Sequence, residues 1–205
     1  MVELQYLDPA VGGAWDDVLL APMAELNAEI LEAVAAGAVP AGGQGLQWRW
    51  QALGAPARQR LAGTPFLLVD AGFAQTGRWA GLPHAGVHDA SPLPPLPRQH
   101  SPLPTPLLLR VLMFAWHLAR SHRLGARVAL GMSAPCAALI GGSRLADLEA
   151  LAIARPPWIQ PRWNSQPEFW SALLAAAAEP SIQPLQRLHL WGLQSIAAEV
   201  TLRAP

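Results

Sequence analysis

Residues 106–122 read PLLLRVLMFAWHLARSH and carry the clearest helical pattern of the chain. Within them Leu109, Leu112, Met113, Trp116 and Arg120 recur at intervals of three and four residues, which places them on one face of an α-helix. The proline at position 106 favours a helix start, because its φ is fixed near the helical value and the first turn needs no N–H there. The segment is therefore predicted to be a helix.

Apolar spacing and capping residues predict more helices on both sides of this segment, at residues 15–36, 47–62, 134–140, 144–154, 166–178 and 185–202. In the first of them the regular helix is expected to start at Pro22, and the second is expected to be interrupted at residues 54–56. Ser133 and Ser143 precede two of them as N-caps, with Gly141-Gly142 as the break between the two. Residues 156–163 are expected to be extended, and residues 66–69 to be a buried strand or a helix start. The predicted fold is mainly α, with a helix-turn-helix-like C-terminal core and up to two short strands.

A proline-rich stretch divides the chain. Seven prolines lie within residues 91–106, where they exclude helices and sheet ladders and favour an extended path. The predicted organisation is a mainly helical N-terminal region (1–90), a proline-rich linker (91–106) and a helical C-terminal region (107–205).

The composition excludes disorder and points to association. Of 205 residues, 52% are hydrophobic and 14% charged, whereas soluble domains have about 25% charged residues. Because so little charge is left to solvate the surface, we expect a protein partner or a second copy to cover part of it.

The charges cancel overall but not locally. Fourteen arginines, with no lysine, balance fourteen acidic residues, so the whole molecule exerts no long-range attraction on nucleic acid or acidic membranes. Residues 1–100 hold nine acids and five arginines, whereas residues 101–205 hold five acids and nine arginines. Any contact with a polyanion is therefore expected in the C-terminal half.

Localisation and cofactors are also constrained by the sequence. Glu3 and Asp8 lie where a signal peptide would be basic and then apolar, and the longest uncharged stretches, of 16 residues, contain Gly and Pro. We therefore expect a cytoplasmic, bacterial protein without membrane spans. The single cysteine, Cys136, excludes an intrachain disulfide and a multi-cysteine zinc site, and the lack of lysine excludes a P-loop. No cofactor is predicted.

One family resemblance covers residues 115–163. The sequence ARVALGMS at 126–133 precedes a short helix and Gly141; Leu145, Leu148, Leu151, Ala152 and Arg162-Trp163 follow. This order resembles the smaller, D-type subunit of the flagellar master transcription regulator. The resemblance implies a helical DNA-binding regulator that works as an oligomer with a second subunit.

Four arginines are the candidate DNA contacts. Arg120, Arg123 and Arg127 follow at three and four residues, so one helical face presents all three if the helix runs through Gly125. Arg144 starts a nearby helix, which also holds two acids that oppose phosphate binding. The leading prediction is a non-enzymatic regulatory protein that acts through protein association, with DNA contact left open. The alternative is an interaction or assembly adaptor without a DNA role.

Tryptophans are the candidate protein contacts. Four of the nine, Trp48, Trp50, Trp158 and Trp163, have polar or proline neighbours, which predicts poor burial. Aromatic residues beside arginine suit protein interfaces and also stacking on single-stranded bases. With zero net charge, a protein interface is the preferred interpretation.

Two further patterns resemble enzyme or metal sites, but each lacks features that such a site needs. Ser133 lies in GMSAP, close to a nucleophile elbow, with Asp147 and His189 following in α/β-hydrolase order, but a proline replaces the second glycine and no set of parallel strands precedes it. A helix cap is the preferred role of Ser133. His84 and His88 are four apart near Asp89, yet Pro and Gly between them disfavour the helix that a metal pair needs. No catalytic or metal-binding residue is predicted.

Overall fold

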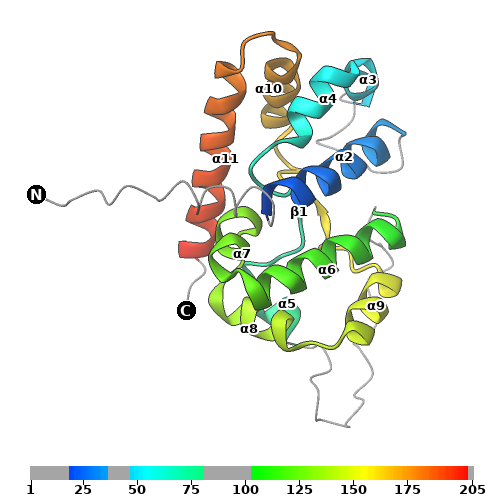
Figure 1. The fold of residues 1–205 in the computed structure, drawn as a ribbon, viewed down its shortest axis with the longest axis vertical. Coiled ribbons are helices and arrows are strands. Elements are labelled where there is room, and N and C mark those ends of the chain that lie inside the picture. The colour runs from blue at the N-terminus through cyan, green and yellow to red at the C-terminus, as the bar shows by residue number, and fades with distance from the viewer. Residues whose placement is uncertain (1–18, 37–46, 81–102, 203–205) are drawn as a thin grey trace, which may run out of the picture.

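The computed structural model describes residues 19–36, 47–80 and 103–202, which form a mainly α-helical structure (Figure 1). The helices are α2 (Ala21–Ala35), α3 (Gln47–Ala52), α4 (Ala55–Ala62), α5 (Thr76–Trp79), α6 (Thr105–Ser121), α7 (Arg123–Leu130), α8 (Ala134–Gly142), α9 (Leu145–Ala154), α10 (Pro167–Ala178) and α11 (Gln183–Leu202). Two short strands, β1 (Val69–Asp70) and β2 (Gln160–Pro161), pair antiparallel. The predicted mainly α fold with up to two strands is confirmed.

The N-terminal helices begin where their prolines and glycines predict. Pro22 lies in the first turn of α2, and Gly54, with extended backbone, separates α3 from α4. The buried face of α2 packs on α3, α4 and α6. Its residues are Met23, Leu26, Asn27, Ile30, Leu31 and Val34.

Helix α6 is surrounded by α2, α7, α8 and α9 (Figure 1). Because it has neighbours on several sides, its buried face is broad and includes Leu108, Val111 and Leu118. The predicted apolar face is therefore misplaced: Met113 is 43% exposed, and Trp116 lies at the border of the core.

Helices α8 and α9 are joined through Ser143 and Arg144 and both pack on α6. Ser133 caps α8 as predicted, its Oγ accepting a hydrogen bond from the Cys136 N–H. The predicted cap at Ser143 is wrong, because Arg144 is the N-cap of α9 and Asp147 accepts a bond from its backbone N–H. The predicted glycine break is also wrong, because both glycines belong to α8.

One buried segment, residues 64–70, runs through the middle of the molecule. Asn27 of α2 donates to the carbonyls of Ala62, Thr64 and Phe66 and accepts from the Leu68 N–H. These bonds satisfy backbone groups that no helix or sheet partner reaches.

Arg162 holds the same segment from the other side. Its guanidinium donates to the carbonyls of Leu67 (3.0 Å), Val69 (3.4 Å) and Leu130 (3.1 Å). Burial lowers the pKa of Arg162, and Asp70 and Glu199 act in the opposite direction. A residue of the C-terminal half thus secures a segment of the N-terminal half.

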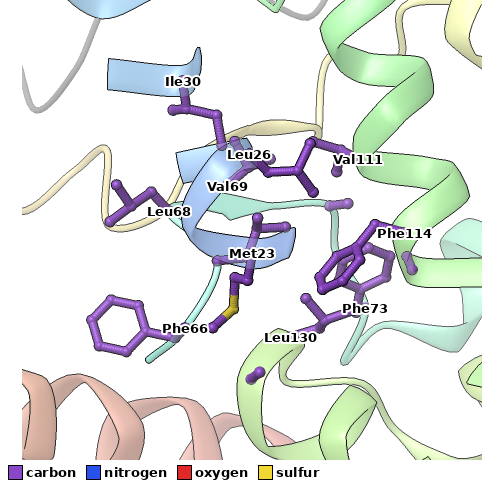
Figure 2. Close-up of a cluster of buried hydrophobic side chains, with 14 of the residues drawn as sticks. Met23, Leu26, Ile30, Phe66, Leu68, Val69, Phe73, Val111, Phe114 and Leu130 are labelled. Atoms are coloured by element: carbon purple, nitrogen blue, oxygen red, sulfur yellow. The ribbon is translucent and has the colours of Figure 1, made fainter. Parts of the chain in front are cut away.

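The described parts of the two halves share one core. Figure 2 shows Met23 of α2, Phe66 of the central segment, Val111 of α6 and Leu130 of α7 in one cluster. Most of the predicted linker, residues 91–102, lies outside the described residues. Within the described ranges no single helix could cross a membrane by length and hydropathy; α7 and α8 meet that criterion only jointly, with a 116° bend between them.

Candidate functional site

The helix predicted to present Arg120, Arg123 and Arg127 on one face is interrupted. His122 has a non-helical backbone (φ −145°, ψ 63°), ends α6, and caps α7 by accepting from the Gly125 N–H at its Nδ1. Arg120 therefore lies on a different helix from Arg123 and Arg127. The prediction of one continuous helical face is wrong.

Two of the four arginines are engaged within the chain. The Arg120 guanidinium lies 4.7 Å from the Trp116 ring centre and donates to the Gly141 carbonyl at 3.3 Å. Arg144 makes two side-chain hydrogen bonds to Asp147, at 3.0 and 3.2 Å, which raise the pKa of Arg144. Contact with phosphate would have to compete with these interactions.

The other two arginines lie beside an exposed apolar pair. Arg123 and Arg127 are exposed one turn apart on α7, and beside them Leu124 is 58% and Val128 44% exposed. We call these four residues the α7 ridge. The ridge borders a groove of about 200 Å³ between α7 and α11, which is lined by Leu124, Arg127, Val128, Leu193, Ala197, Val200 and Thr201.

A larger groove, of about 860 Å³, lies between α2 and α4. Its lining includes Ala24, Ala28 and Leu31, and the exposed Glu25 and Glu32 stand on the α2 side. No sequence-based prediction pointed to this groove. The available signal was alanine at positions 21, 24 and 28, because small side chains at helical spacing leave room beside a helix.

Across the groove, Arg58 projects from α4. Its guanidinium donates to the carbonyls of Gln51 (3.1 Å) and Trp50 (3.5 Å). The α2–α4 groove thus has an apolar floor, an acidic rim on α2 and a hydrogen-bonded arginine on α4.

Two of the four candidate interface tryptophans lie in the core instead. Trp50 and Trp163 are only 2% and 8% exposed. Trp163 has φ 51°, and its ring packs between Phe66 and Phe169, at centre distances of 5.3 and 4.5 Å. The prediction of poor burial is wrong for both, because Trp50 packs on Trp170 of α10 and Trp163 packs on Trp191 of α11. Trp158 is half-buried, and Trp48 is 62% exposed.

The residues of the hydrolase pattern have separate roles. The Ser133 hydroxyl caps α8 and lies 3.3 Å from Thr76 Oγ1, while Asp147 binds Arg144. His189 packs against Phe66, and burial lowers the pKa of His189 to about 4. Burial also raises the pKa of the Cys136 thiol to about 12, so this thiol stays protonated at neutral pH.

The histidine pair of the metal hypothesis, His84 and His88, lies with Asp89 outside the described residues. Among residues 19–36, 47–80 and 103–202, no group of three His, Cys, Asp or Glu side chains could hold a metal ion.

Comparison with known proteins gives no matching family model, no matching curated protein and no matching solved structure.

Proposed function

We propose that this protein is a non-enzymatic regulatory protein that acts through protein association. The observation that carries the proposal is the α7 ridge, where two exposed apolar side chains lie beside two exposed arginines at the edge of an apolar groove. Covering apolar surface with another protein lowers the free energy, because that surface leaves water. Arginine is also enriched at protein interfaces. The resemblance to the flagellar regulator also implies a regulatory protein that works in association with other subunits.

The exposed face of α9 supports protein rather than DNA as the main partner. In the helix-turn-helix interpretation, α9 is the helix that would meet DNA. Its exposed side chains include Leu145 (45% exposed), Ile153 (73% exposed) and the acidic Glu149. Such a face gives phosphates no positive charge, and the carboxylate repels them.

DNA contact is the second candidate, favoured by Arg123 and Arg127. Both side chains are exposed, and the α7 sequence contains no acid. Two phosphate contacts would give weak binding whose logarithm falls with the logarithm of salt concentration with a slope of about −2. This binding should disappear in the double variant Arg123→Ala/Arg127→Ala.

Photo-crosslinking in cells tests the main proposal. A photoreactive amino acid placed at Val128 should form crosslinks to protein, and these should be lost when Leu124→Glu is added. The control position is Ala138, which is exposed on α8, outside the α7–α11 groove. No protein crosslinks above this control would overturn the proposal. Crosslinks to DNA alone, together with salt-sensitive DNA binding by the purified protein, would replace it with the second candidate.

A further inference from the structure

The α7 ridge and the α2–α4 groove have opposite charges. The ridge carries Arg123 and Arg127, both exposed. The groove carries Glu25 and Glu32 on its α2 rim, both also exposed. The acid between them in helical register, Glu29, forms an ion pair with Arg110 of α6 and is already neutralised.

The two surfaces also match in shape. Leu124 and Val128 project from α7, with roughly half of each side chain exposed. The groove is lined by small residues on both walls, including Ala24, Ala28 and Ala62. Small side chains allow a helix to approach closely, within about 8–10 Å between axes.

The charges fix the orientation of such a contact. The arginines belong on the α2 side, because Arg58 on the α4 side would repel them. Glu25 and Glu32 are two helical turns apart, about 10 Å along the axis, and Arg123 and Arg127 are one turn apart, about 6 Å. Long, flexible arginine side chains can bridge this difference.

We propose that the α2–α4 groove binds the α7 ridge of a second copy of this chain. The proposal rests on the proposed function, since it names the partner of the α7 ridge. The arginines of one copy face the glutamates of the other, while Leu124 and Val128 cover the apolar floor. The contact joins two different surfaces of the same protein, so each copy offers both halves of it.

Charge reversal tests the proposal. The variants are Glu25→Arg/Glu32→Arg and Arg123→Glu/Arg127→Glu, measured by analytical ultracentrifugation over a series of micromolar concentrations. The wild type should self-associate, more weakly at high salt. Each variant alone should raise the dissociation constant roughly 100-fold, because like charges then face one another.

Mixing the two variants should restore association. In the mixture each reversed surface meets a surface of opposite charge, so the dissociation constant should return to within about tenfold of the wild-type value. All four positions are exposed, and circular dichroism should show that both variants remain folded. Matched controls are Glu149→Arg and Arg187→Glu, exposed charges outside both surfaces, which should leave association unchanged.

Three results would overturn the proposal: a wild type that stays monomeric, reversal variants that associate like the wild type, or a mixture that does not recover. The proposed function fails separately. If the wild type is monomeric while Val128 crosslinks to a different protein in cells, the self-association proposal falls and the proposed function stands. If Val128 forms no protein crosslinks, both fall.

Discussion

Arg162 shows how one buried charge can determine the interior of the molecule. Its guanidinium is shared by three carbonyls from two separate segments, Leu67 and Val69 in one and Leu130 in the other. Its own carbonyl accepts the indole N–H of Trp170 at 2.9 Å. Arg162 stabilises the fold only while all these partners are in place, because each buried donor or acceptor left without a hydrogen bond lowers the free energy of unfolding.

Replacing Arg162 should therefore be severe. Arg162→Met leaves the three carbonyls without their donor and should lower the free energy of unfolding by about 3–5 kcal/mol, measured by urea denaturation. Arg162→Lys should not rescue the loss, because a single ammonium cannot reproduce the guanidinium fork. The exposed Arg187→Met, as control, should change stability by less than about 0.5 kcal/mol. Wild-type stability in Arg162→Lys would contradict this role.

His189 should make stability depend on pH. Its folded pKa, about 4, is below the ordinary value of 6.5, because burial opposes the charged ring. The unfolded chain therefore takes up a proton first, so stability is full above pH 6.5 and is lost as the pH falls from 6.5 toward 4. In His189→Leu this loss should be absent, which urea denaturation at several pH values measures. An identical pH profile in both proteins would contradict the assignment.

At the scale of elements, α11 depends on one close approach. A Cβ at Gly192 would lie 2.6 Å from Phe66 Cζ and 3.2 Å from Trp163 Cη2, and both rings belong to the core. Neither ring can move without disturbing the aromatic cluster. The glycine is therefore required by packing, in the interior of a helix where glycine is otherwise unfavourable.

Gly192→Ala should push α11 away from the core and lower the free energy of unfolding by about 1–3 kcal/mol, measured by thermal and urea denaturation. The matched control is Gly142→Ala, at the end of α8, where an added Cβ meets nothing within 4 Å. This control should be neutral or stabilising by up to about 1 kcal/mol. A tolerated Gly192→Ala would mean that α11 does not pack as closely as the structure has it.

The helices were predictable because their signals are local. Apolar spacing and proline positions located α2 and α6 within a residue or two of their observed bounds. The break at His122 was not predictable, since histidine is no general helix breaker and acts here through its ring nitrogen. Gly141 was misinterpreted as a break: α8 continues to Gly142 and packs on α6, and the Gly141 carbonyl accepts a hydrogen bond from Arg120.

The candidate site was less predictable, because it depends on which elements meet. The α7 arginines were found from spacing alone, but the α2–α4 groove forms between two helices that are not consecutive in the chain. Trp50 and Trp163 illustrate the same limit: their sequence neighbours suggest exposure, while α10 and α11 bury them. Local sequence patterns predict single helices and strands, but they do not predict which distant elements pack together.

At the scale of the whole molecule, the two halves interlock instead of forming separate domains. Residues 64–70 of the N-terminal half are bound by Arg162, and β1 pairs with β2. Arg60 of α4 donates two hydrogen bonds to the carbonyl of Ala177 in α10, at 3.0 and 2.6 Å. Each half thus supplies hydrogen-bond donors for carbonyls of the other half, which would otherwise be unpaired.

Separating the halves should therefore abolish folding. A fragment of residues 103–205 lacks two of the three carbonyls that accept hydrogen bonds from Arg162, those of Leu67 and Val69. It also lacks the apolar segment 64–70 that fills its core, so it should show no cooperative thermal transition by circular dichroism. Produced together with residues 1–90, it should form a complex of one copy of each fragment, with full-length helix content, detected by size-exclusion chromatography. In that complex Arg162→Met should weaken the joining of the fragments, since its hydrogen bonds cross between them. A fragment 103–205 that melts cooperatively at the full-length temperature would show instead that the C-terminal half is an independent domain.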